Sequence, residues 1–373
     1  MKKNLMLFVV QICFSLIIFK AYSQQGHWDS LITKNQVRGR SECGMAASNG
    51  KLYLIGGDGA SSVEVFDPAE LTWSKKSAPP VGMNHFEAVS FNNNIYVLEA
   101  FESGGFPNQT NLSNVYIYNT RTDSWHTGSG LVPERRRAAA GAVEYHGKLY
   151  LVNGIQHGHS SGTTNMFDVY DPETDRWSLL PDAPHIRDHC EAAVVGDKLY
   201  VAGGRNTSYR DPNNIITFFS QTVLDVDCYD FKSGTWSTLS AKLPLGSGGG
   251  SMVNLNGILY YFGGERATQA ERNAPRKNTF YLDPVNSTRW VESDSLKLAR
   301  NGMSAAVLNN KIYAFGGTGS GGPMPNGPAG GPPPGMAMNQ PNDSLRMRPP
   351  QGGGPERQQA FSPLEVFTVN NLQ

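Results

Sequence analysis

The sequence is poor in cysteine and in charge, and it lacks the local motifs of several large protein classes. Four cysteines occur in 373 residues, and charged residues make up 17% of the chain. The 32 basic residues balance the 32 acidic ones without forming a Lys/Arg run, which argues against a nucleic-acid partner because such partners favour a basic surface. A paired-cysteine metal motif, a nucleophile elbow and a phosphate-binding loop are all absent from the sequence. We therefore expect no bound cofactor.

A long apolar stretch occurs only at the N-terminus. Lys2 and Lys3 precede the uncharged, mostly apolar segment Leu5–Phe19, and small residues of Ala21–Ser23 suit cleavage after Ser23. The fifteen residues of Leu5–Phe19 fall short of the ~20 that span a bilayer. The pattern predicts a signal peptide over 1–23 and a secreted or periplasmic protein without a membrane span after cleavage. An uncleaved N-terminal anchor is the alternative.

The chain does contain an internal repeat with two markers. The first is an aromatic residue followed seven positions later by tryptophan, as in Phe66/Trp73, Tyr118/Trp125, Tyr170/Trp177 and Tyr229/Trp236. The second is an apolar run around a tyrosine that usually ends in Gly-Gly, as in KLYLIGG from Lys51, KLYVAGG from Lys198, ILYYFGG from Ile258 and KIYAFGG from Lys311. The marker tyrosines recur every 43 to 60 residues, at Tyr53, Tyr96, Tyr150, Tyr200, Tyr260 and Tyr313. A period of about 50 with several short strands per repeat is typical of propeller blades.

In six copies these markers resemble the kelch repeat, and the resemblance covers about residues 27 to 373. It implies an all-β fold, a six-bladed kelch β-propeller that makes up one domain over 24–373. The run before Gly-Gly is predicted to be an inner strand buried on both sides. Each tryptophan is expected to pack the outer strand of its blade onto the next blade.

The two ends of the repeat predict how the propeller closes. The tryptophan expected seven residues after Phe367 would fall beyond the last residue, whereas Trp28 precedes the first marker strand. We therefore expect a strand around His27–Leu31 to complete the last blade beside the strand that starts at Leu364. Such pairing covers an otherwise open sheet edge.

One segment breaks the repeat. Residues 318–360 contain ten glycines and ten prolines, a composition that cannot bury enough apolar surface to fold. We predict a disordered insertion in the sixth blade, with a mobile lid or a tether for a partner as the alternative.

In propellers of this kind, the residues that enter each innermost strand and those that follow Gly-Gly converge at the channel mouth. Two blades carry a similar His-x-Glu sequence there, which makes His85, Glu87, His189 and Glu191 the candidate catalytic residues. Histidine and glutamate can transfer protons near neutral pH. The candidate ligand-binding residues are His157, His159, Arg137, Arg187 and Arg205, since arginine holds carboxylates in bidentate fashion.

Two of these interpretations have alternatives. Arg40, Arg137, Arg187 and Arg300 share one repeat position, and such repetition also suits a structural role in which they join neighbouring blades. A metal site formed by His157 and His159 with His85 or His189 would use imidazole ligands. Because the spacing matches no known ligand motif, we expect no metal.

The function predicted from these residues is binding of a glycan or small sugar at the channel mouth. The alternatives are a carbohydrate-active enzyme of the epimerase, mutarotase or lyase type, and a platform for protein partners. In architecture the chain is similar to N-acetylneuraminate epimerase and to the propeller of galactose oxidase. The copper-binding residues and the Cys–Tyr cross-link of the oxidase have no counterpart here, so these resemblances imply a fold and not an activity.

Overall fold

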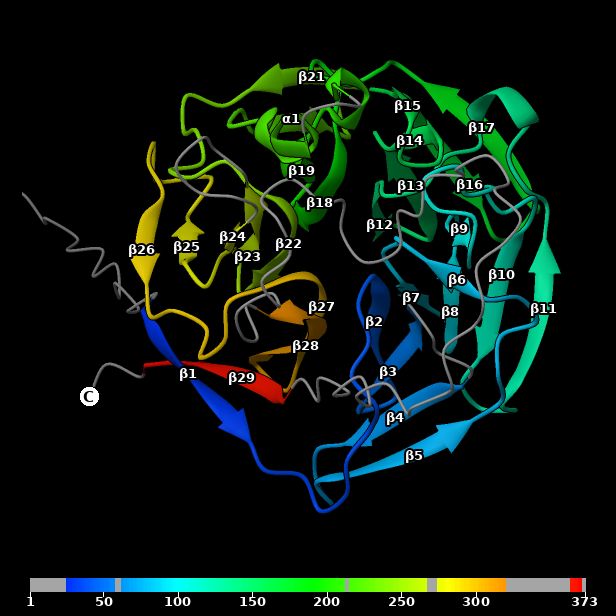
Figure 1. The fold of residues 1–373 in the computed structure, drawn as a ribbon, viewed down its shortest axis with the longest axis vertical. Helices are drawn as coiled ribbons and strands as arrows, with labels where there is room; N and C mark the ends of the chain where they lie inside the picture. Colours follow the sequence, from blue (N-terminus) through cyan, green and yellow to red (C-terminus); the bar gives the residue numbers. More distant parts are fainter. Residues whose placement is uncertain (1–24, 58–61, 212–214, 267–273, 320–362, 371–373) are drawn as a thin grey trace, which may run out of the picture.

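The computed structural model describes residues 25–57, 62–211, 215–266, 274–319 and 363–370, which form a six-bladed β-propeller around a central channel (Figure 1). The segment 1–23 and nearly all of the Gly/Pro-rich segment 318–360 lie outside the described residues. Among the described residues, no helix combines the length and apolar character needed to cross a membrane. The six-bladed propeller confirms the fold predicted from the repeat.

Each blade is an antiparallel sheet, and in blades 1 to 5 the strands run in sequence order from the channel to the rim. Blade 1 contains β2 (Cys43–Ser48), β3 (Lys51–Gly56), β4 (Val63–Asp67) and β5 (Thr72–Lys76). Blade 2 contains β7 (Val89–Phe91), β8 (Asn94–Val97), β10 (Val115–Asn119) and β11 (Ser124–Gly128). Blade 3 contains β12 (Gly141–Tyr145), β13 (Lys148–Val152), β16 (Phe167–Asp171) and β17 (Arg176–Leu180).

The remaining blades follow the same plan. Blade 4 contains β18 (Asp188–Val195), β19 (Lys198–Arg205), β20 (Asp227–Asp230) and β21 (Thr235–Thr238). Blade 5 contains β22 (Gly248–Leu255), β23 (Ile258–Arg266), β25 (Thr279–Leu282) and β26 (Val291–Ser293), with β24 (Ala274–Pro275) paired to β23. Blade 6 contains β27 (Arg300–Leu308), β28 (Lys311–Gly319), β29 (Leu364–Val369) and β1 (Gly26–Leu31).

Short elements cover the mouth above blades 2 to 4. They are the ribbon β6 (Met83–Asn84)–β9 (Phe101–Glu102), the hairpin β14 (Ile155–His157)–β15 (Ser161–Thr163), two 3-10 turns (Pro133–Arg135 and Thr207–Tyr209) and α1 (Ile215–Ser220). The innermost strands of the six blades contact one another in a closed ring, β2–β7–β12–β18–β22–β27.

Alternation along the marker strand explains its burial on both sides. In β3, Leu52 and Leu54 pack toward blade 6, whereas Tyr53 and Ile55 pack toward blade 2. Successive side chains of a strand point to opposite faces, so a continuous apolar run fills both interfaces between blades. The strand ends at Gly56, whose φ is +61° and whose Cβ, if present, would lie 2.5 Å from the Met83 carbonyl oxygen. Only glycine fits this turn without moving the next blade.

The N-terminal strand closes the propeller as predicted. β1 pairs with β29, and Trp28 lies opposite Phe367. The indole is fully buried, with its ring centroid 5.0 Å from that of Phe262 in blade 5 and its Nε1–H donating to Thr279 Oγ1 at 2.9 Å. Blade 6 is therefore built from both ends of the described chain.

The tryptophans join blades in the direction opposite to our prediction. The indole N–H of Trp125 donates to the carbonyl oxygen of Ser77, which follows the outer strand of blade 1. Trp177, Trp236 and Trp290 bond in the same way to Ser129, Pro181 and Ala241. Each of these carbonyls belongs to the preceding blade, so packing onto the next blade was wrong. The reason is that each indole N–H finds its acceptor in the segment that connects the two blades.

The four repeated arginines stabilise their own blades. Each guanidinium donates to the carbonyl sixteen residues downstream, where the marker strand ends, and pairs with a carboxylate on the third strand. In blade 4, Arg187 bonds the Gly203 carbonyl at 3.0 Å and Asp227 at 2.7 Å, and both side chains are fully buried. The structural role is therefore confirmed. The guanidinium groups hold their own blades, whereas the main-chain carbonyls of Arg187 and Arg40 accept from Gly154 and Gly317 of the neighbouring blades, at 2.9 and 2.8 Å.

Candidate functional site

At the channel mouth, one residue in each blade has a left-handed backbone conformation. These residues lie eleven positions before the marker tyrosines. Their φ values range from 52° to 62°, at Glu42, His85, Ala139, His189, Gly249 and Gly302. Side chains raise the energy of this conformation by about 1–2 kcal/mol relative to glycine. Blades 5 and 6 use glycine here, whereas blades 1, 2 and 4 keep a charged or imidazole side chain despite that cost.

Backbone hydrogen bonds link these residues from blade to blade. The N–H groups of Glu42, His85, Ala139 and His189 donate to the carbonyl oxygens of Gly302, Glu42, His85 and Ala139, at 2.7–2.8 Å. The side chains are therefore displayed from a fixed collar of backbone. Rigid backbone support is the requirement for a preorganised binding site.

Three histidines meet at the mouth. His85 and His189 come from the collar, and His159 comes from the turn between β14 and β15. Their ring centroids lie 4.6–5.2 Å apart. Burial lowers the pKa of His159 and of His189 well below the usual range, with neighbouring positive groups acting in the same direction. The imidazoles of His159 and His189 are therefore neutral at physiological pH.

The structure separates His157 from this cluster. Alternate residues of an extended strand share a face, which is why His157 and His159 were expected to act together. Instead, Gly158 (φ +56°) turns the chain, so that His159 is buried while His157 remains exposed. The expectation that both histidines face the site is wrong, and only His159 joins it.

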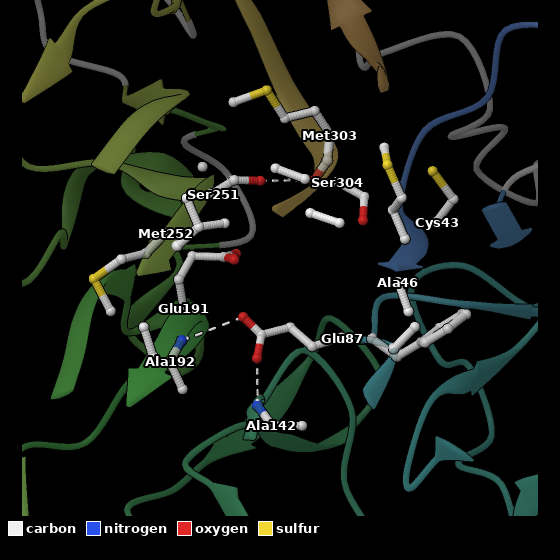
Figure 2. A pocket seen from close by; sticks show the side chains of 18 of the residues that line it. Cys43, Ala46, Glu87, Ala142, Glu191, Ala192, Ser251, Met252, Met303 and Ser304 are labelled. Carbon is white, nitrogen blue, oxygen red and sulfur yellow. Dashed lines mark hydrogen bonds between the residues drawn. The ribbon is translucent and has the colours of Figure 1, made fainter. Parts of the chain in front are cut away.

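Below the histidines, Glu87 and Glu191 form a carboxyl pair in the channel. The two carboxyl groups lie close enough to each other for the charge state of one to shift the pKa of the other. Glu87 also accepts hydrogen bonds from the backbone N–H groups of Ala142 and Ala192, the latter at 3.2 Å (Figure 2). Burial raises the pKa of Glu87 to about 7. It raises the pKa of Glu191 well above the usual range, and the Glu87 charge adds to this effect.

The pattern of donors decides where the proton lies. Two backbone N–H groups favour the ionised form of Glu87, whereas Glu191 is the partner whose pKa the pair raises. The donor pattern therefore favours the proton on Glu191 and the ionised form on Glu87. Together, the two carboxyls offer both a donor and acceptors to anything that enters the channel.

A cavity of about 310 Å³ surrounds this pair (Figure 2). Small and flexible side chains of the innermost strands form its wall, among them Ala46, Ala142, Ala192, Ser251, Ser304, Met252 and Met303. His85 and His189 also contact it. The candidate catalytic residues from both His-x-Glu sequences thus lie in one cavity, with the histidines toward the mouth and the glutamates deeper.

The raised pKa values predict how stability depends on pH. A carboxyl that keeps its proton in the folded protein, but loses it near pH 4.5 when unfolded, destabilises the fold as pH rises. We expect the free energy of unfolding to fall between about pH 4.5 and 7. Glu191→Gln keeps a donor toward Glu87 without an ionisable group, and should make unfolding at pH 8 more costly by about 1–3 kcal/mol. Denaturant unfolding at pH 5 and pH 8 would measure this.

The control for that experiment is Glu173→Gln, which changes an exposed carboxylate on the turn between β16 and β17. It should leave the difference between pH 5 and pH 8 as in the unsubstituted protein. Equal pH dependence in Glu191→Gln and in the unsubstituted protein would show that the channel pair does not retain a proton.

The three arginines predicted to bind ligand do not face the cavity. Arg137 and Arg187 are fully buried and hold carbonyl groups of their own blades, so we assign them to stability. Arg205 is 2% exposed and pairs with Glu265 at 2.9 Å. A guanidinium that is already neutralised and buried makes a poor anchor for an incoming anion.

Sequence reasoning missed the residues that orient the histidines. They are Asn84, Gln109 and Asp188, and all three are buried. Asn84 and Asp188 directly precede the collar histidines, so their repeated position was visible in the sequence. Gln109 lies in the loop between β9 and β10, which has no counterpart in the repeat, and no pattern pointed to it.

Closed blades, the Gly-Gly marker strands and the channel site define this molecule as a kelch-type β-propeller. A model described as the KLHDC2/KLHL20/DRC7 Kelch-repeats domain matches residues 11–204, and the Kelch motif model matches residues 186–242. The chain therefore belongs to the kelch-repeat family.

Individual relatives are distant. Kelch-like protein terF of Aspergillus terreus is 25% identical over 78% of this chain and 64% of its own length. Alpha-scruin of Limulus polyphemus is 26% identical over 56% of this chain and 22% of its own length. The chain thus spans less than two thirds of these relatives. The solved structure of YjhT superposes with a TM-score of 0.63 at 17% identity, over 78% of this chain and 94% of that one, which supports the fold alone.

Proposed function

We propose that this kelch propeller binds a small hydroxylated ligand, a monosaccharide or a short glycan, in its central channel, and that it does so outside the cytoplasm. The observation that carries the proposal is the Glu87–Glu191 pair, held in a cavity whose wall consists largely of alanine, serine and methionine side chains. The extracytoplasmic location rests on the sequence of residues 1–23. It is tested by determining the N-terminus of the protein recovered from its native cells.

The chemistry of the cavity suits sugar hydroxyls. Each hydroxyl both donates and accepts a hydrogen bond, and the carboxyl pair offers the same two roles. Met252 and Met303 add polarisable apolar surface, which can adapt to the C–H faces of a sugar ring. A volume of about 310 Å³ lies at the lower end of ligand sites, so we expect one or two sugar rings and not a long chain.

A specific observation favours the enzyme as second candidate. A general acid or base works best when its pKa is near the working pH, and burial raises the pKa of Glu87 to about 7. An epimerase or mutarotase needs such a group beside the sugar. Proton NMR of a freshly dissolved pure anomer, with and without the protein, tests mutarotation directly.

The binding proposal predicts ligand-dependent stability. In a thermal-shift panel of neutral and acidic sugars at pH 7, a ligand at 100 times its Kd should stabilise the protein by about 2.7 kcal/mol. Glu87→Ala removes the acceptor of the pair and should abolish the shift for the best sugar. Glu173→Gln should retain it.

Three outcomes have distinct meanings. Loss of the shift in Glu87→Ala alone supports the channel site. An unchanged shift in this variant would place the sugar elsewhere on the propeller. The absence of any shift across the panel would contradict a sugar ligand and favour the third candidate, a platform for protein partners.

A further inference from the structure

The three mouth histidines share a feature that a packed aromatic cluster does not require. The Nδ1 atom of each ring lies within hydrogen-bond distance of an oxygen acceptor: Asn84 Oδ1 for His85 (2.8 Å), Gln109 Oε1 for His159 (3.0 Å) and Asp188 Oδ1 for His189 (2.6 Å). Nδ1 therefore carries the proton in all three rings. At His159 and His189 the Nε2 atom then keeps its lone pair, whereas His85 Nε2 lies 3.6 Å from Glu42 Oε2.

Ring nitrogens of the three histidines converge. One nitrogen from each of His85, His159 and His189 lies within 4.8 Å of the corresponding atoms of the other two. His189 Nε2 is buried and makes no hydrogen bond to any residue within the described segments. A buried polar atom without a partner costs about 1–3 kcal/mol, so its retention at this point calls for a ligand.

The groups behind the histidines are themselves held in place. Asp188 Oδ1 also accepts from Thr207 Oγ1 at 2.6 Å, and Asp188 Oδ2 accepts from Thr163 Oγ1 at 2.6 Å and from the Thr207 backbone N–H at 3.0 Å. Histidines that bind metals almost always donate their other ring N–H to a carboxylate or carbonyl oxygen, which fixes tautomer and orientation. This arrangement is present at all three rings here.

The backbone supplies an independent argument. His85 and His189 keep a left-handed conformation at positions where two other blades use glycine. Strained residues persist where the surrounding structure holds them, and they concentrate at functional sites. The packing of a blade does not need a side chain at this position.

The surroundings also suit a cation with imidazole ligands. Phe101 and Phe106 pack on the His159 ring with centroids 5.3 and 5.1 Å away, which limits access of water. Glu42 Oε2 lies 3.6 Å from His85 Nε2, within reach of a fourth coordination position. Arg205, a buried cation near the cluster, is paired with Glu265 at 2.9 Å.

We propose that His85, His159 and His189 bind a divalent first-row transition metal ion, with Zn²⁺ as the reference ion, through their Nε2 atoms. Zn–N bonds of about 2.0–2.1 Å in tetrahedral geometry place the nitrogens about 3.4 Å apart, so the rings need to close by little more than 1 Å. Two of the three ligands contact the channel cavity. The bound ion would therefore lie at the edge of the proposed ligand site.

This proposal reverses the expectation of no metal. The ligands come from three blades and are separated by 74 and 30 residues in sequence, so no local spacing motif exists to find. All three ligands were among the histidines considered for a metal site from the sequence, together with His157. The turn at Gly158 decides that His159, and not His157, joins the cluster.

The test uses the protein prepared without a polyhistidine tag and stripped with EDTA. Calorimetric titration with Zn²⁺ should show one site per chain, and Co²⁺ should give the visible absorption of a low-coordinate site. His85→Gly and His189→Gly remove a ligand and relieve the left-handed backbone, so the metal-free fold should persist. Each should weaken Zn²⁺ binding by roughly 100-fold or more, beyond the 10–100-fold expected for Gln109→Leu, which removes only an orienting contact.

His146→Gly is the matched control. His146 has the same left-handed conformation (φ 48°) but lies exposed in the turn between β12 and β13, at the opposite end of the innermost strand. It should bind Zn²⁺ as the unsubstituted protein does. If a glycine variant fails to fold, His159→Ala decides the question. Uptake of no Zn²⁺ by the unsubstituted protein, or equal affinity in His159→Ala and His146→Gly, would overturn the proposal.

Discussion

Replacing Trp28 with alanine is expected to lower the free energy of unfolding by about 3–5 kcal/mol, the usual cost of truncating a fully buried tryptophan. The indole fills the interface between blades 5 and 6, where its ring centroid lies 5.2 Å from that of Phe367 and its N–H donates to Thr279. Denaturant unfolding, followed by circular dichroism of the backbone and not by tryptophan fluorescence, would measure the change.

Removal of residues 25–31 should have a larger effect, because it exposes the whole edge of β29 in addition to the cavity left by Trp28. Ile32→Ala is the control, since Ile32 follows β1 directly and is 88% exposed. A change within about 0.5 kcal/mol is expected there. Unaltered unfolding after removal of β1 would show that the propeller does not depend on this closure.

Arg187→Ala is expected to destabilise the protein by a similar amount, about 3–5 kcal/mol, because it leaves Asp227 buried without its cationic partner. The guanidinium also holds the carbonyl groups of Gly203 and Asp225, so three strands of blade 4 lose a common contact. Unfolding in urea would show a lower midpoint.

Arg121→Ala tests whether this effect is specific, because Arg121 is exposed on the turn between β10 and β11. It should change stability by no more than about 0.5 kcal/mol. If Arg187→Ala folds with normal stability but loses affinity for a channel ligand, the assignment of Arg187 to the blade is incorrect. Its original interpretation as a ligand-binding residue would then hold.

The fold could be predicted because the repeat encodes it six times. Each marker tyrosine lies in an inner strand, and the position of Trp28 ahead of the first repeat identifies the closing strand from the sequence alone. The direction in which the tryptophans join blades could not be predicted. It depends on which carbonyl group accepts the indole N–H, and the sequence of a single repeat does not specify that group.

The site was predictable where it repeats. His85, Glu87, His189 and Glu191 share positions in two blades and do meet in one cavity. Residues outside the repeat were harder to assign. The turn at Gly158 buries His159 and leaves His157 exposed, so only one of the two joins the site. Arg205 was correctly expected near the mouth, but the sequence does not indicate its ion pair with Glu265 of the next blade.

The collar of backbone hydrogen bonds has a consequence for how such a propeller can diversify. Since the bonds run through main-chain N–H and carbonyl groups, the spacing around the mouth does not depend on which side chains are displayed. Each blade therefore offers one interchangeable position on a shared frame. A lineage could exchange glycine, glutamate and histidine at these positions one at a time, and so acquire or lose a site without rebuilding the architecture that presents it.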